Sequence, residues 1–227
     1  VITSPATQGI FTWSFNSGSE AFDHIADGEQ LQLSYTLRAT DSAGGNSTDT
    51  ILLISIVGGN DAPVCTLQSG NSDSTTLNET NAALSTSGTL TVRDLDLSNT
   101  VVATVQGVSK SGTTNGPSGS LSSSDTQLLA MLSLSPSAIL SSSQTSNTLT
   151  WAFNSGAEAF NYLADSESLT LTYSLLFTDS SGATASKAVV ITVNGSNDAP
   201  TASAGGATTT LIEAGGVANA ITGQSSS

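Results

Sequence analysis

The chain has 227 residues, and its 18 Asp and Glu against 4 Lys and Arg give a net charge of -14. Nucleic acids and anionic membrane surfaces both attract clustered cations, so four scattered cations argue against either as a partner. No run of 18 or more apolar residues is present, so no membrane-inserted helix is predicted. An acidic chain does attract divalent cations when folding brings its carboxylates together.

The predicted elements are almost all strands. Apolar residues alternate with polar ones over residues 31–39, and again over 169–175, which is the period of a half-buried strand. Further strands are expected at 51–57, 88–93, 99–106, 148–153 and 189–193. Residues 126–134 fit either a short helix or a strand, and residues 157–164 indicate a helical turn. Many short strands with turns between them predict an all-β fold, an antiparallel β-sandwich.

The sequence repeats itself. Residues 11–44 (FTWSFNSGSEAFDHIADGEQLQLSYTLRATDSAG) match residues 149–182 (LTWAFNSGAEAFNYLADSESLTLTYSLLFTDSSG). GGNDAP at 58–63 then matches GSNDAP at 195–200, and TTLNE at 75–79 has a fainter echo in TTLIE at 209–213. We therefore expect three segments: 1–63, the C-terminal part of a first repeat; 64–200, a complete repeat; and 201–227, the start of a further repeat. With no signal peptide at Val1, the chain reads as an excised or processed piece.

Acidic and amide residues gather at turns beside predicted strand ends. IADGE carries Asp27 and Glu29, and VRDLDL carries Asp94 and Asp96. Side chains alternate along an extended segment, so the Asp-x-Asp spacing places both carboxylates on one side. Calcium binds about six to eight oxygens from carboxylates, amides and carbonyls. Taken alone, Asp41 and Asp179 favour metal-free turns, and the Asp-x-Asp pair suits a turn or a metal site equally well. The full set in one order favours calcium sites.

The run from W-x-F through ADGE, ATDSAG and GGNDAP resembles the VCBS repeat of large bacterial adhesins of the RTX type, over nearly the whole chain. The order of its acidic motifs is also similar to that of cadherin domains, which bind calcium between successive domains. The resemblance implies tandem cadherin-like or Ig-like sandwiches with Ca²⁺ at each junction. At the first junction it implies these ligands: Asp27, Glu29, Asn60, Asp61, Glu79, Asp94, Asp96 and Asp179. At the second it implies Asp165, Glu167, Asn197, Asp198 and Glu213.

Other interpretations of single residues are weaker. Trp13 and Trp151 fit a core better than a ligand platform, because W-x-F places both aromatic rings on one face of a strand. His24 has Tyr162 as its counterpart, so its position does not require imidazole. No G-x-S-x-G elbow and no nucleophile–His pairing is recognisable, and acidic residues duplicated along tandem repeats suit structure better than catalysis. No enzyme is predicted.

Three functions remain open from the sequence. The first is a calcium-stiffened spacer in a secreted or cell-surface bacterial adhesin, acting in adhesion or biofilm formation, with adjacent repeats as its partners. The second is a subunit of an extracellular filament, in which residues 201–227 supply a strand to another copy. The third is carbohydrate binding, which no cluster of aromatic residues supports.

Overall fold

The computed structural model describes residues 9–116 and 119–200. The chain divides into two compact units, Val1–Asn197 and Asp198–Ser227. The described strands all lie in the first unit, and the second contributes only residues 198–200 to the described part.

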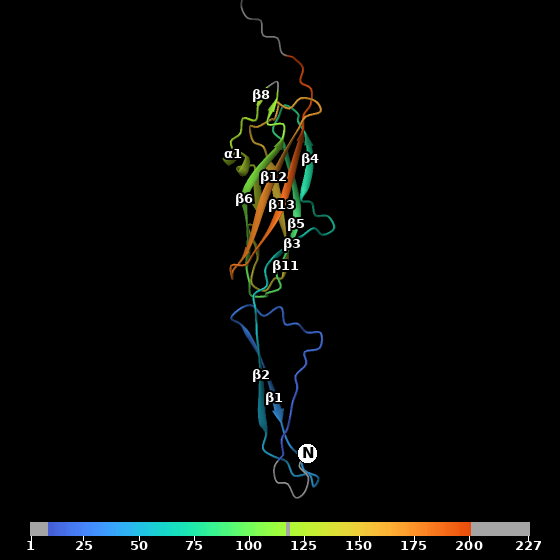
Figure 1. Cartoon of the computed structure of the whole chain (residues 1–227), viewed down its shortest axis with the longest axis vertical. Helices are drawn as coiled ribbons and strands as arrows, with labels where there is room; N and C mark the ends of the chain where they lie inside the picture. The colour runs from blue at the N-terminus through green and yellow to red at the C-terminus, as the bar shows by residue number, and fades with distance from the viewer. Residues whose placement is uncertain (1–8, 117–118, 201–227) are drawn as a thin grey trace, which may run out of the picture. The chain divides into compact units, whose positions relative to one another are not determined.

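Residues 64–194, within the segment predicted as a complete repeat and called so below, fold as a β-sandwich of two sheets. Five strands form the first sheet, in the order β10 (Ala138–Leu140), β6 (Val101–Gly112), β12 (Ser168–Asp179), β13 (Thr184–Asn194) and β4 (Ser74–Asn78). Four form the second: β3 (Val64–Thr66), β5 (Ser85–Arg93), β11 (Ser146–Asn154) and β9 (Leu132–Ser135). Figure 1 shows β6, β12 and β13 running side by side. The predicted all-β sandwich is confirmed, with one departure from antiparallel pairing: β4 lies parallel to β13.

The core lies between the two sheets and follows the alternation seen in the sequence. On β12, Leu171, Tyr173, Leu175 and Phe177 are buried, while the residues that alternate with them are more exposed. On β11, Trp151 is fully buried, and its Nε1 donates a hydrogen bond of 2.7 Å to the carbonyl of Ser72. Each large apolar side chain buried in this way stabilises the fold by about 1.5–3 kcal/mol. The core role expected for Trp151 is confirmed.

Two local predictions are settled by the structure. Residues 126–134 form both the short helix and the strand that the sequence allowed, because α1 (Asp125–Ala130) ends just before β9. A capping box between Ser124 and Gln127 starts the helix. The helical turn predicted at 157–164 is wrong. Phe160 has a φ of 63°, which a right-handed helix does not admit, and its counterpart Phe22 has a φ of 62°. The short strands β3, β4 and β10 were not predicted.

The first repeat contributes a hairpin of β1 (Gln30–Leu37) and β2 (Thr50–Val57), which matches β12 and β13 in sequence. Its apolar side chains are less covered than their counterparts. Tyr35 is 44% exposed whereas Tyr173 is 0%, and Trp13 is 53% exposed. The core role expected for Trp13 is therefore not seen among the described residues. A small two-stranded pair, β7 (Asn115–Gly116) and β8 (Gly119–Ser120), completes the described elements.

The packing of Trp151 leads to a stability prediction. A Cβ added at Gly88 would overlap the indole ring of Trp151, whereas one added at Gly107 has no atom within 4 Å. We expect Gly88→Ala to lower the free energy of unfolding by about 1–3 kcal/mol, a typical cost of overpacking. Gly107→Ala, also on a strand, serves as the control and should change it little. Urea denaturation followed by tryptophan fluorescence measures both, and equal midpoints for the two variants would contradict this packing.

Candidate metal centre

The Asp-x-Asp motif lies at one end of the sandwich, directly after β5. Asp94 and Asp96 are 2% and 0% exposed, although both carry carboxylates. The backbone N–H of Asp96 donates to Oδ1 of Asp94 at 3.1 Å, which folds the loop so that both side chains turn inward. Oδ2 of Asp94 and Oδ1 of Asp96 are buried with no hydrogen-bond partner among the described residues. Such oxygens cost free energy unless a cation or donor approaches them.

The linker between the repeats meets this loop directly. The N–H of Asp61 donates to Oδ2 of Asp96 at 2.7 Å. Nδ2 of Asn60 donates to Oδ2 of Asp179 at 3.0 Å, so the linker also contacts the β12–β13 turn. The structure therefore brings together five of the residues predicted as ligands: Asn60, Asp61, Asp94, Asp96 and Asp179.

One member of the site was not predicted. Asn99 is 4% exposed, and its Nδ2 lies 2.8 Å from Oδ1 of Asn60 and 3.1 Å from Oδ2 of Asp96. Its Oδ1 accepts from the hydroxyl of Ser180 at 3.0 Å. The only signal in the sequence was an Asn three residues after the second Asp, in DLDLSN. We call the following residues the junction cluster: Asn60, Asp61, Asp94, Asp96, Asn99 and Asp179.

The electrostatics of the junction cluster disfavour its ionised state. Burial raises the pKa of Asp94, and the charges of Asp96, Asp179 and Asp61 raise it further, against a hydrogen bond from the Asp96 backbone. Burial also raises the pKa of Asp96, as do the charges of Asp61, Asp179 and Glu29. Ionisation of both carboxylates is therefore energetically unfavourable at neutral pH, and a bound cation would offset that free-energy cost.

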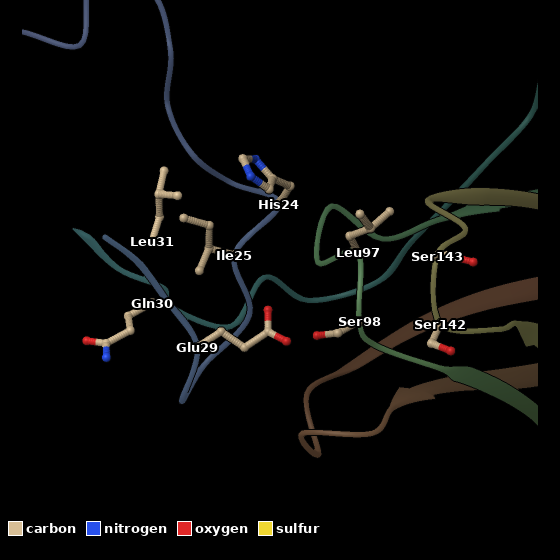
Figure 2. Close-up of a pocket in the computed structure, with 9 residues that line it drawn as sticks. All are labelled: His24, Ile25, Glu29, Gln30, Leu31, Leu97, Ser98, Ser142 and Ser143. Atoms are coloured by element: carbon tan, nitrogen blue, oxygen red, sulfur yellow. The ribbon is translucent and has the colours of Figure 1, made fainter. Parts of the chain in front are cut away.

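Of the two acidic residues in the ADGE turn, Glu29 is the one near the cluster. Its Oε2 accepts from the N–H of Ala26 at 3.3 Å, and Figure 2 shows its carboxylate pointing toward Ser98. The groove drawn there is lined by residues of this turn and of the loop after Asp96, and the N–H of Leu97 donates to the carbonyl of His24 at 3.2 Å. Asp27 is exposed, and among the described residues no hydrogen bond or ion pair joins its side chain to the junction cluster.

Glu79 does not belong to the first junction, which corrects its predicted assignment. Its N–H donates to the carbonyl of Asn194, and its Oε2 accepts from the hydroxyl of Ser196 at 2.6 Å. Asn194 is the last residue of β13. The first residue, Thr184, pairs with Thr178, the neighbour of Asp179, so Asp179 lies at the opposite end of the strand. A strand rises about 3.3 Å per residue, so Glu79 lies roughly 30 Å from the Asp179 end. Because β4 runs parallel to β13, it delivers Glu79 to the far end.

The predicted ligands of the second junction are only partly placed. Glu167 closes its turn as Glu29 does, with Oε2 accepting from the N–H of Ala164 at 2.9 Å. Asp165 is exposed and lines a small polar pocket together with Glu167, and Asn197 and Asp198 are also exposed. Glu213 lies outside the described residues.

The junction cluster provides candidate oxygen ligands but not a complete coordination sphere. Within residues 9–116 and 119–200, no three Asp, Glu, His or Cys side chains converge closely enough to hold a metal without adjustment. The fit to calcium comes from its chemistry: two buried oxygens without partners, further carboxylates close enough to raise their pKa, and amide oxygens alongside. Hard oxygen donors on flexible loops are what calcium selects, and thiols or imidazoles are absent from the junction cluster.

Comparisons with known proteins assign the chain to no family. No protein-family model and no curated protein matches the chain. A PapD-like domain of human CEP192 is similar at a TM-score of 0.38 and 8% identity, over 62% of this chain and 89% of its own. The CooA pilin subunit from enterotoxigenic Escherichia coli is similar at a TM-score of 0.34 and 14% identity, over 61% of this chain and 100% of its own. No helix of the described residues is long and apolar enough to cross a membrane.

The unpaired oxygen of Asp96 leads to a stability prediction: removing the charge of this residue should stabilise the metal-free protein. Asp96 has a raised pKa, so its ionisation opposes folding: in chelator, the free energy of unfolding should fall as pH rises from below the ordinary aspartate pKa through the raised value. We expect Asp96→Asn in chelator at pH 7 to stabilise the protein, on the order of 1 kcal/mol, and to flatten this dependence. Asp49→Asn is the control, because Arg38 lowers the pKa of that exposed carboxyl. Thermal melts across pH test both. Destabilisation by Asp96→Asn in chelator would contradict the prediction.

Proposed function

We propose that the chain is a spacer module whose repeats are stiffened by calcium at their junctions. The observation that carries the proposal is the pair of buried, unpartnered carboxylate oxygens on Asp94 and Asp96, at the point where the linker residue Asp61 docks. The proposed role is mechanical rather than catalytic.

Calcium would be held by groups from both repeats. Asp61 and Glu29 belong to the first repeat, and Asp94, Asp96 and Asp179 to the complete one, with the oxygens of Asn60 and Asn99 alongside. A linker alone leaves successive domains free to swing. An ion bound to carboxylates on both sides resists that swing, because bending would pull ligands away from it and leave their charges uncompensated.

Hydrogen bonds across the junction, which involve no metal, support the proposed mechanical role. Asn60 bonds both Asp179 and Asn99, and Asp61 bonds Asp96, so the linker already follows the end of the sandwich. Calcium would then add ionic contacts to a geometry that is largely in place, which reduces the ordering cost of binding.

The proposed setting is a large secreted or cell-surface bacterial adhesin, in which such repeats hold a binding domain away from the cell. Extracellular calcium modules bind with dissociation constants of about 10⁻⁴–10⁻³ M, which suits calcium levels outside cells. In that range the repeats stay flexible where calcium is scarce and stiffen where it is abundant. Adjacent repeats are the partners that the proposal requires.

Calcium should stabilise the protein through the junction cluster. At 10 mM calcium and the affinities above, binding should raise the free energy of unfolding by about 1–3 kcal/mol. Asp94→Asn combined with Asp96→Asn should abolish the gain, whereas Asp125→Asn, on an exposed side chain in α1, should keep it. Calorimetric titration of calcium, with melts in calcium and in chelator, measures this. Equal gains in the double variant and the control would refute the proposal, as would no gain in the unmodified chain.

A further inference from the structure

The side chain of Asn99 joins three separate segments of the chain at the junction. Its Nδ2 donates to Oδ1 of Asn60 in the linker at 2.8 Å, and to Oδ2 of Asp96 in the loop after β5 at 3.1 Å. Its Oδ1 accepts from the hydroxyls of Ser180 and Ser181, in the β12–β13 turn, at 3.0 and 3.3 Å. A carboxamide has two N–H donors and an oxygen with two acceptor positions. Asn99 therefore uses its full hydrogen-bonding capacity while it is buried.

The carboxylates around Asn60 and Asn99 determine which way round the two amides lie. An ionised carboxylate only accepts hydrogen bonds, so Asn60 must turn its Nδ2 toward Oδ2 of Asp179, where it lies at 3.0 Å. The oxygen of Asn60 then faces Asn99, which must turn its own Nδ2 toward that oxygen. Oδ2 of Asp96 requires the same orientation of Asn99 independently. The oxygen of Asn99 is thus left to the two serine hydroxyls.

The amino group of Asn99 also helps to determine which carboxylate oxygens remain free. Oδ2 of Asp96 is held from two sides, by Nδ2 of Asn99 and by the N–H of Asp61 at 2.7 Å. With Oδ2 fixed, Oδ1 of Asp96 is the oxygen that stays buried without a partner among the described residues. Groups that hydrogen-bond a metal ligand in this way fix its orientation, and they are worth about 10–100-fold in metal affinity.

We propose that Asn99 is a positioning residue of the junction, whose amino group holds the linker against the sandwich and orients Asp96 for the ion. The part that concerns calcium rests on the proposed function, whereas the hold on the linker requires no metal. Of the two amide residues alongside the carboxylates, Asn99 takes part through its N–H donors rather than as an oxygen ligand. Replacement by aspartate separates these two roles, because aspartate has nearly the same shape, keeps an oxygen and loses both donors.

Calorimetric titration of the full chain with calcium tests the positioning of Asp96. Asn99→Asp and Asn99→Leu should each weaken calcium binding by about tenfold or more, because neither variant supplies the N–H donors. Asn71→Leu is the matched control: Asn71 joins a loop to β5 through Thr89 and Thr91, and should leave the dissociation constant unchanged. Binding by Asn99→Asp that is as tight as that of the unmodified chain, or tighter, would show that the oxygen is a ligand and would overturn the proposal.

Hydrogen exchange of single amides, followed by NMR in chelator, tests the hold on the linker without calcium. The probe is the N–H of Asp61, which donates to Asp96. The reference is the N–H of Glu79, which donates to the carbonyl of Asn194 at the far end of the sandwich at 2.8 Å. Asn99→Leu should speed exchange at Asp61 by about tenfold or more and leave Glu79 unchanged. Equal acceleration at both amides would show a general loss of stability, and no acceleration at Asp61 would show that Asn99 does not hold the linker. Either result would overturn the proposal.

Together the two experiments separate this inference from the proposed function. If the unmodified chain binds no calcium, the proposed function fails, while exchange at Asp61 in chelator still decides whether Asn99 holds the linker. If the unmodified chain binds calcium and Asn99→Leu binds it equally well, the proposed function stands and the positioning role of Asn99 fails.

Discussion

The burial of two carboxylates at one end of the sandwich costs free energy, and the contacts at the repeat junction form around these two groups. Asp94 and Asp96 follow β5 without a break, so once β5 is part of the sheet their side chains must lie at its end. Oδ1 of Asp94 accepts one hydrogen bond and Oδ2 of Asp96 accepts two, while the other oxygen of each carboxylate has no partner among the described residues. The linker docks onto this charge through the Asp61 N–H, and one oxygen of each carboxylate stays buried without a hydrogen-bond partner among the described residues, at a cost in free energy.

The junction also uses residues far from Asp94 and Asp96 in the sequence. The turn after β12 helps the junction through Asp179, whose Oδ1 accepts from the N–H groups of Ser181 and Ala183 while its Oδ2 accepts from Asn60. Asp41 closes the matching turn of the first repeat in the same way, with N–H donors from Ala43 and Gly45. The same aspartate is thus a turn residue in both repeats and becomes a junction residue only where a linker reaches it.

The two copies show how one sequence pattern gives different surfaces. Oε1 of Glu158 accepts from the N–H of Phe160, and its Oε2 accepts from Ser122 and Ser123. Glu20 accepts the equivalent bond from Phe22, but it is exposed. Local hydrogen bonds are therefore reproduced, whereas those that need a distant strand are not. Leu52, Ile54 and Ile56 of β2 are accordingly only half-buried, whereas their counterparts on β13 are buried.

Alternation in the sequence was sufficient to predict the long strands and the sandwich, because the side-chain period of a strand is local and one face of each sheet is apolar. Five of the six junction-cluster residues were among the ligands that the resemblance to cadherin domains implied, because their motifs lie at turns beside predicted strand ends and can be recognised locally. Tertiary structure alone decided which end each acidic residue occupies. Glu79 was assigned wrongly because nothing local reveals that β4 pairs in parallel, and Asn99 was missed because its role depends on a contact with Asn60, 39 residues earlier in the chain.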